Sequence, residues 1–473
     1  MKDSTLLLID GHSLAFRAFY ALRAENFVTD GGQHTNAVSG FLTTLLKLIA
    51  DYEPTHIAVA FDLPGGTFRT RIYEEYKGGR AQTPEEFKGQ IELIQQSLNA
   101  MGISWLTVED YEADDIVATL SRRGADGGMR VYISSGDKDS FQLVDEQCTV
   151  LYPMPRSETQ VLDVDGVLAK TGVLPSRYRD LAALVGENAD NLPGVPGVGP
   201  KTAAKWIAAY GGVEQILAES AGIKGKAGES LRAHADQVLL NMKLNELVRD
   251  LPIVEDLEDL RPIGVDREAL HRLFDTLNFR NLRSRVLAEL PSRDGTNGNG
   301  PEASSQIVVS REPFTDWVSQ THGPYGVFLV DPEALPGGGA VAVGAPGGKA
   351  WIRQWKDDAA ALGAFLADSD RPKVFHGAKA AAHLLRKADV ELEGVSRDTL
   401  LQAYLLHPDQ RVYDLDDLAV RYLGRQLHDG QQPATLFDDI DSDGSAAAAA
   451  ALVDLSEAFD VELAERGEDG ALV

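Results

Sequence analysis

Short apolar runs alternate with longer amphipathic stretches along the first 290 residues of the chain. The runs Thr5–Asp10, 56–62 and 130–137 are rich in Leu, Ile, Val and Ala, as expected for strands buried on both faces of a parallel sheet. Between them, residues 37–49 and 85–101 place apolar side chains at helical spacing. This alternation predicts an α/β fold, a parallel sheet with helices on both faces.

The pattern stops at residues 291–301, which are rich in Gly, Asn, Pro and Ser and predict a linker. We therefore expect domains at 1–290 and 306–473 joined by a linker over 291–305, within the two to four domains that 473 residues suggest. In the second half, the apolar run Tyr325–Val330 predicts a strand, and the alanine run 446–451 predicts a helix.

Three of the expected strands end in, or run directly into, an aspartate: Asp10, Asp62 and Asp137. Ligand sites of open parallel sheets lie beyond the carboxyl ends of their strands, so these acids should converge on one edge. Each one alone could equally be a helix N-cap or a turn former.

Further acids follow in the strings 111–118, 137–139 and 186–191. One acid in a first helical turn is favoured by the macrodipole, but so many close together repel unless a cation neutralises them. No His or Cys cluster accompanies them, and hard oxygen ligands select Mg²⁺ or Mn²⁺ for two-metal phosphodiester hydrolysis. The nine candidate ligands are Asp10, Asp62, Glu112, Asp114, Asp115, Asp137, Asp139, Glu187 and Asp190.

Basic and aromatic residues lie between the second and third predicted strands, in residues 67–80. Tyr73, Tyr76, Lys77 and Arg80 share one face of an expected helix. Lys77 and Arg80 would reach a phosphate and Tyr76 would offer its ring to a base, with Arg69 as a further DNA contact. A solvated amphipathic helix explains the same spacing, although phosphoryl transfer does need cations.

The Gly/Pro string 192–203 is the most specific in the chain. It predicts a tight hairpin leading into a helix that begins near Pro200. Its glycines would let backbone N–H groups approach a DNA phosphate at a helix N-terminus. Such a contact does not depend on the base sequence of the DNA. An ordinary helix-turn-helix packing element is the alternative. The expected DNA contacts are Gly197, Gly199, Lys201 and Thr202.

These motifs resemble the bacterial 5′–3′ exonuclease/flap endonuclease family over residues 1–290. More narrowly, the chain is similar to the N-terminal portion of bacterial DNA polymerase I. The resemblance rests on Asp10, Phe61-Asp62, and the strings 76–80, 111–115, 137–139, 190–194 and 197–203. It implies a PIN/flap-endonuclease-like domain: a parallel sheet, a helical arch and a helix-two-turn-helix element that grips duplex DNA.

The resemblance also implies roles. The acids would bind two or more Mg²⁺ or Mn²⁺ ions, directly or through water, with Asp115 and Asp137 catalytic. Lys77 and Arg80 would polarise the scissile phosphate, and the backbone of Val195 and Val198 would hold K⁺ beside a DNA phosphate. Glu187 departs from the family, which usually has Asp there.

The second half resembles a ribonuclease H-like 3′–5′ exonuclease domain, which needs four acidic ligands. Asp331 and Glu333 fall at the first pair, but Ala381 stands where the third belongs, and Leu452 replaces the fourth unless Asp454 takes its place. Losing two of four ligands should abolish two-metal chemistry, so we expect an inactive domain. No palm or fingers motif of a polymerase domain follows within the 473 residues.

The leading hypothesis is a metal-dependent 5′ nuclease that cuts flapped, nicked or gapped DNA duplexes. A PIN-like ribonuclease and a catalytically dead DNA-binding scaffold are the alternatives. The lone Cys148 excludes an internal disulfide, and no apolar run is long enough to span a membrane, so we expect a cytoplasmic, nucleoid-associated protein.

The net charge of −27 argues against DNA binding only when it is taken over the whole chain. Residues 1–300 carry −12 and residues 301–473 carry −15. Nine acids of the first part belong to the expected metal site, which leaves the rest of that part nearly neutral. We therefore expect DNA affinity to be local and strongly dependent on salt and metal.

Overall fold

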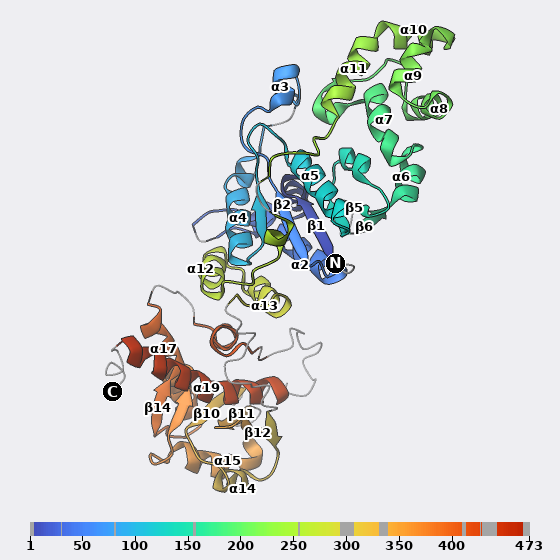
Figure 1. Ribbon diagram of the computed structural model, residues 1–473. Helices are drawn as coiled ribbons and strands as arrows, with labels where there is room; N and C mark the ends of the chain where they lie inside the picture. Colours follow the sequence, from blue (N-terminus) through green and yellow to red (C-terminus); the bar gives the residue numbers. More distant parts are fainter. Residues whose placement is uncertain are drawn as a thin grey trace. The chain divides into compact units, whose positions relative to one another are not determined.

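The computed structural model divides into two compact units, Met1–Arg293 and Asp294–Val473, each described here by itself (Figure 1). The boundary falls inside the stretch 291–305 that was expected to be a linker. The structure describes residues 4–29, 31–79, 82–154, 158–253, 256–293, 307–330, 339–408, 413–425, 427 and 442–466.

A six-stranded sheet forms the centre of the first unit, in the order β3-β2-β1-β4-β5-β6. Every neighbouring pair is parallel except β5 and β6, so the carboxyl ends of β2, β1 and β4 meet at one edge. The predicted α/β alternation is confirmed. The strands are β1 Thr5–Asp10, β2 His56–Ala60, β3 Ser104–Leu106, β4 Arg130–Ser134, β5 Cys148–Pro153 and β6 Thr159–Leu162.

Alternate side chains of β1 bury into two separate cores. Leu6 and Leu8 pack in the core that contains helix α5 (Ala113–Asp126). Leu7 and Ile9 pack in the core that contains α1 (Gly11–Ala21) and α2 (Asn36–Tyr52). Because both faces are covered, Leu6 to Ile9 are a continuous apolar run, and the next polar side chain, Asp10, comes at the carboxyl edge of the sheet.

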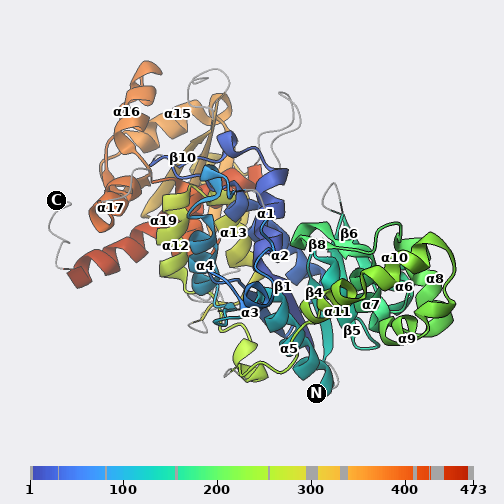
Figure 2. The same ribbon diagram turned by 90° about the horizontal axis from the view of Figure 1, so that it is seen from above.

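Helices α6 to α11 form a group beside the sheet (Figures 1 and 2). Within this group α8 begins at Pro200, where the sequence predicts a helix to start. The remaining helices of the unit are α3 Phe68–Ile72, α4 Gln90–Ala100, α6 Val164–Thr171, α7 Tyr178–Val185, α8 Pro200–Tyr210, α9 Val213–Ala218, α10 Gly225–Ala233, α11 Ala235–Leu244, α12 Arg267–Leu277 and α13 Arg280–Glu289.

Short 3₁₀ turns and one two-stranded ladder complete the first unit. The expected helix over 85–101 is interrupted by Gly89 at φ 78°, a left-handed conformation that separates the turn η2 from α4. The ladder joins β7 Gly186–Glu187 to β8 Leu192–Pro193. The turns are η1 Ala24–Asn26, η2 Glu85–Phe87, η3 Lys138–Leu143, η5 Pro175–Arg177, η6 Asn188–Asp190, η7 Ser220–Gly222 and η8 Leu257–Leu260.

The second unit is also a six-stranded sheet covered by helices, in the order β14-β13-β10-β11-β12-β9. Strand β10 has the bounds that the sequence predicts. Its elements are β9 Val308–Ser310, β10 Tyr325–Val330, β11 Ala340–Ala345, β12 Lys349–Gln354, β13 Lys373–Phe375, β14 Val395–Asp398, α14 Phe314–Ser319, α15 Trp355–Leu366, α16 Ala378–Lys387, α17 Thr399–Leu406, α18 Leu415–Leu418, the π-helical turn η10 Ala419–Leu423 and α19 Ser442–Arg466.

The alanine run is confirmed as helical and lies in α19, close against β10 and β11. A Cβ atom at Gly326 or Gly344 would come within 2.3 Å of the Ala449 carbonyl oxygen. Only glycine at these two strand positions lets the helix pack this closely against the sheet. Among the described residues, no helix is long and apolar enough to cross a membrane.

Candidate metal centre

The three strand-end aspartates each accept a backbone hydrogen bond from the first turn of a helical element: Asp10 and Asp137 cap the element that follows them, and Asp62 bonds the start of α5. Asp10 accepts hydrogen bonds from the Ser13 N–H (2.9 Å) and the Ser135 hydroxyl (3.1 Å). Asp62 accepts from the Ala113 N–H at 2.7 Å. Asp137 accepts from the Asp139 N–H at 2.9 Å. These hydrogen bonds do not exclude a role as metal ligands, because each carboxylate keeps further lone pairs for a cation.

Asp137, Asp139 and Glu187 form the tightest carboxylate group. One oxygen of each lies within 4.8 Å of the others. Asp139 Oδ1 and Glu187 Oε2 are buried and accept no hydrogen bond. A buried acceptor without a partner is costly, and two that face a third carboxylate suit a divalent cation with oxygen ligands.

The position of Glu187 depends on the contact between β7 and β8. A Cβ atom on Gly194 would lie 1.9 Å from the Val185 carbonyl oxygen, and one on Gly186 would lie 2.2 Å from the Gly194 nitrogen. Gly186 also has φ 81°, which disfavours other residues. Asn241 fixes the same ladder from α11 by donating to the carbonyls of Ala183 (3.0 Å) and Pro193 (2.9 Å).

Burial and mutual repulsion govern the protonation of this group. Burial, with the charges of Asp62 and Asp137, raises the pKa of Asp10 to about 7. Burial, with the charges of Asp137 and Asp190, likewise raises the pKa of Glu187 to about 7. The pKa values of Asp114 and Asp139 are raised well above the usual range for the same reasons. The protein alone does not neutralise the site.

The repulsions define two overlapping groups of acids, which share Asp114 and Asp137. Around Asp114 the interacting carboxylates are Asp10, Asp62 and Asp137. Around Asp139 they are Glu187, Asp137, Asp114 and Asp190. Asp114 and Asp137 thus belong to both groups, which concentrates negative charge at one edge of the sheet.

The contacts of Asp115 and Arg69 contradict the roles that were predicted for them in metal binding and DNA binding. Both carboxylate oxygens of Asp115 bind Arg69, at 2.6 and 2.8 Å, and they also accept the N–H groups of Val248 (2.9 Å) and Glu112 (3.2 Å). Both side chains are essentially inaccessible. Asp115 therefore has no lone pair to offer a metal and is not a catalytic residue, and Arg69 cannot contact DNA.

Tyr76 differs from expectation, and its neighbour Lys77 lies beside the acids. Tyr76 is buried, and its hydroxyl lies within hydrogen-bonding distance of Glu112 Oε2 (3.1 Å) and Asp190 Oδ2 (3.2 Å), so the prediction that it stacks on a base is wrong. Burial and these two carboxylates raise the pKa of Tyr76, which keeps it a donor. Lys77 Nζ lies 2.9 Å from Glu112 Oε1 and lowers the pKa of Asp114 against the other acids.

The helical face expected over residues 73–80 does not form. Helix α3 ends at Ile72, and turns follow through residue 79, with Lys77 at φ 59°. The backbone is held by bonds outside a helix, from the Lys77 N–H to the Asp190 carbonyl (3.0 Å) and from Asn191 Nδ2 to the Glu75 carbonyl (2.8 Å). Arg80 lies outside the described residues.

The predicted hairpin is present on the surface. The Val198 N–H donates to the Val195 carbonyl at 2.9 Å, and Gly197 occupies the left-handed position at φ 80° that a Pro-Gly turn requires. Gly197, Gly199 and Lys201 are exposed and Thr202 is half-buried, whereas the side chains of Val195 and Val198 are buried.

Sequence reasoning overlooked His12 and Ser135. The Asp62 N–H donates to His12 Nδ1 at 3.1 Å, so this nitrogen is unprotonated in the neutral ring. Ser135 bonds Asp10 and also accepts the Asp137 N–H at 3.0 Å, thereby joining the ends of two strands. Their adjacency to Asp10 and Asp137 in the sequence was the available signal.

The second unit lacks a comparable centre in its described part. Ala381 lies buried in α16, and Leu452 is fully buried in the core with Val374 and Phe459. Asp454 pairs with Arg425 at 2.5 Å. Asp331 and Glu333 lie outside the described residues. Among the described residues, Asp137, Asp139 and Glu187 of the first unit are the only group of three metal-ligating side chains with ligand atoms within 4.8 Å of one another.

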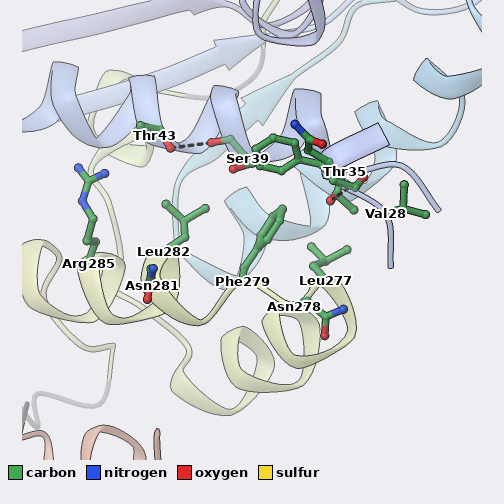
Figure 3. Close-up of a pocket in the computed structure, with 12 residues that line it drawn as sticks. Val28, Thr35, Ser39, Thr43, Leu277, Asn278, Phe279, Asn281, Leu282 and Arg285 are labelled. Atoms are coloured by element: carbon green, nitrogen blue, oxygen red, sulfur yellow. Dashed lines mark hydrogen bonds between the residues drawn. The ribbon is translucent and has the colours of Figure 1, made fainter. Parts of the chain in front are cut away.

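A hollow of about 530 Å³ lies away from these acids, between α2 and helices α12 and α13. Figure 3 shows Phe279 and Leu282 directed toward α2, with Thr43 bonded to the Ser39 carbonyl above them. Arg285 is the only charged side chain in its lining, so the hollow offers no acid-base chemistry.

Three domain families match the sequence. The "5′-3′ exonuclease, N-terminal resolvase-like domain" matches residues 5–172, and the "5′-3′ exonuclease, C-terminal SAM fold" matches residues 173–268. The "DNA polymerase I, ribonuclease H-like domain" matches residues 348–431. The chain is similar in sequence to part of DNA polymerase I. Its first unit contains both 5′-3′ exonuclease domains, and its second contains the ribonuclease H-like domain.

Two relatives show the extent of the match. DNA polymerase I of Mycobacterium bovis is 45% identical over 97% of this chain and 53% of its own length. DNA polymerase I of Bacillus caldotenax is 37% identical over 87% of the chain and 46% of its own length. The chain thus spans about half the length of these relatives. The solved T5 5′-exonuclease with zinc is 21% identical, with a TM-score of 0.44, over 59% of this chain and 99% of its own.

Glu187 provides a direct test of the carboxylate group. Changing Glu187→Gln keeps the side chain's volume but removes one of the three charges that converge with Asp137 and Asp139. We expect divalent-metal affinity to fall by about 10–100-fold, the range typical of perturbing such sites, as measured by calorimetric titration. Glu146→Gln, at an exposed position, is the control; equal affinities of the two variants would contradict a ligand role for Glu187.

Proposed function

We propose that this chain is a structure-specific 5′ nuclease that hydrolyses DNA at 5′ flaps, nicks and gaps. The observation that carries the proposal is the acidic cluster at the carboxyl edge of the sheet, in which one oxygen each of Asp137, Asp139 and Glu187 lies within 4.8 Å of the others. The exposed glycine turn at 197–199 supplies the second requirement, a phosphate contact that does not depend on base sequence.

The metals would be Mg²⁺ or Mn²⁺, held by Asp10, Asp62, Asp114, Asp137, Asp139, Glu187 and Asp190, with Glu112 holding Lys77 beside them. When bound, such ions activate water and stabilise the attacking and leaving oxygens. Oxygen-only donors favour these ions over softer ones. We further propose that the carbonyls near Val195 and Val198 hold K⁺ against a DNA phosphate.

The protein's own groups supply orientation and positive charge. Lys77 reaches the acids from a left-handed turn, where its ammonium group can contact a phosphate, and we propose the same task for Arg80. The single O–H of Tyr76 lies within hydrogen-bonding distance of both Glu112 and Asp190 and can donate to either, which keeps the two carboxylates close together. Gly197, Gly199, Lys201 and Thr202 would hold the duplex.

A labelled 5′-flap duplex incubated with Mg²⁺ tests the proposal. We expect cleavage near the junction, a 5′-phosphate on the product and no cleavage without metal. Cutting of RNA alone would favour a PIN-like ribonuclease. Binding without cutting would favour an inactive scaffold. Either outcome would overturn the proposal.

We propose that the second unit has no proofreading activity, because Ala381 and buried Leu452 occupy two ligand positions. In an Asp137→Asn background, single-stranded DNA labelled at its 5′ end should not be shortened from its 3′ end in Mg²⁺. Shortening that disappears on a further Asp331→Ala change would contradict this prediction.

The relatives are DNA polymerase I proteins, and they suggest in which process and where in the cell the chain acts. We propose that the chain acts in replication and repair in the bacterial cytoplasm, near the nucleoid, and that a polymerase domain accompanies it in the whole protein. Extension of a primer by that whole protein, after its flap is cut, would test this arrangement.

A further inference from the structure

The turn that carries Lys77 rests on a distant segment of the chain, residues 190–192. The Lys77 N–H donates to the Asp190 carbonyl at 3.0 Å. Tyr76, the residue before it, is buried in a small apolar cluster with Leu192 of β8. Backbone and side-chain contacts thus both hold this turn against the same segment, and the place of the lysine beside the acids depends on it.

Residues 190–192 also connect the metal centre to the glycine hairpin. Asp190 is itself one of the candidate ligands, and Leu192 begins β8, the strand that pairs with β7 and so places Glu187. The hairpin of residues 195–198 follows in the chain. A contact that joins this segment to the neighbouring lysine turn therefore sets the lysine in register with the carboxylates.

Asn191 makes such a contact. Its side-chain Nδ2 donates to the Glu75 carbonyl at 2.8 Å, across 116 residues of sequence. The same carbonyl accepts the Gly78 N–H at 2.9 Å. That bond closes the turn around Lys77, whose φ is 59°. The Asn191 amide therefore braces the backbone oxygen on which the turn closes.

The backbone of Asn191 offers a simpler reason for the residue type. Its φ is 57°, a left-handed conformation that asparagine and glycine tolerate best. Asn191 is also exposed, so the core does not require an amide at this position. If the backbone conformation alone mattered, glycine would serve as well as asparagine, and this difference separates the two explanations.

We propose that Asn191 is a positioning residue, which holds Lys77 beside the carboxylates by bonding the Glu75 carbonyl. Phosphoryl transfer depends on cations that are already in place when charge develops on the phosphate, and small misplacements of such groups are costly. Asn191 itself need touch neither metal nor phosphate. This inference rests on the proposed function and adds to it the residue that sets the position of its lysine.

Asn191→Gly tests the positioning role, because it keeps the left-handed backbone and removes the amide. On a 5′-flap duplex in Mg²⁺, its kcat should fall by about tenfold, at the upper end of what one hydrogen bond contributes. Its KM should stay unchanged, because the hairpin that would hold the duplex is untouched. Cleavage as fast as that of the unchanged chain, or a change in KM alone, would overturn the inference.

A double-mutant cycle shows whether the amide acts through Lys77. Lys77→Met keeps the aliphatic stem and removes the ammonium group. If Asn191 acts by placing that group, Asn191→Gly should lower kcat no further in the Lys77→Met background, because both changes remove the same contribution. Losses that multiply would indicate a general effect on structure and would also overturn the inference.

Asn278→Gly is the matched control. Asn278 is likewise exposed and left-handed, at φ 59°, where α12 ends, and it lines the hollow that lies away from the acids. The two glycine variants should unfold at similar temperatures, and only Asn191→Gly should lose kcat. Equal losses of kcat in both would contradict a specific role for Asn191.

Amide hydrogen exchange keeps the two proposals distinguishable, because it needs no substrate. Exchange at Lys77 and Gly78 should be faster in Asn191→Gly than in the unchanged chain, while exchange in β1 stays the same. If the unchanged chain cuts no flap but this difference appears, the proposed function fails and the hold of Asn191 on Lys77 stands. If flaps are cut and neither exchange nor kcat is altered, the inference fails alone.

Discussion

Asp137→Asn should abolish 5′ cleavage while leaving the fold intact. Asp137 belongs to both carboxylate groups, so its charge contributes to every cation position at the sheet edge. Losing about 4 kcal/mol of transition-state stabilisation would lower kcat about a thousandfold. Single-turnover cleavage of a flap duplex in Mg²⁺ measures this change.

The same substitution should stabilise the protein when metal is absent. Asparagine keeps the acceptor for the Asp139 N–H and removes a charge that repels Asp10, Asp114, Asp139 and Glu187. Thermal unfolding in a chelator should therefore shift upward. Added Mg²⁺ should stabilise the variant less than the unchanged chain. A strongly destabilised variant, or one that still cuts, would contradict this account of Asp137.

Sequence patterns predicted the site best where it depends on topology. A strand buried on both faces is a continuous apolar run, so Thr5–Asp10 was recognisable and its last residue had to lie at the sheet edge. Parallel neighbours then brought Asp62 and Asp137 to the same edge. The helix start at Pro200 followed in the same way from local Gly/Pro chemistry.

Residues 67–80 were predicted less well, because long-range contacts decide their structure. Spacing at 73, 76, 77 and 80 suited a helix, yet contacts with residues 190–191 hold a turn instead. Residue type alone could not distinguish Asp114, which faces the acids, from its neighbour Asp115, which faces Arg69. Adjacent helical positions point in different directions, and which one meets a partner 46 residues away is set by packing.

Arg69→Met should be the most destabilising change in the first unit. Burial alone would lower the pKa of Arg69, but the hydrogen bonds and charges of Asp115 and Glu112 outweigh it and raise that pKa. Its remaining donors bind the carbonyls of Leu244 and Glu246, each at 2.8 Å. Methionine would leave Asp115 ionised, buried and without its partner.

Breaking a buried pair in this way costs about 3–5 kcal/mol, so the melting temperature of the first unit should fall by about 10 °C. Arg71→Met is the matched control on the same helix. Arg71 pairs with Asp110 at 2.5 Å but is well exposed, and exposed pairs contribute about 0–1 kcal/mol. Arg69→Lys should recover little, because an ammonium group cannot bind both oxygens of Asp115 and two carbonyls in the guanidinium's planar geometry. Equal shifts for Arg69→Met and Arg71→Met would show that the buried pair does not join α3, α5 and the segment after α11.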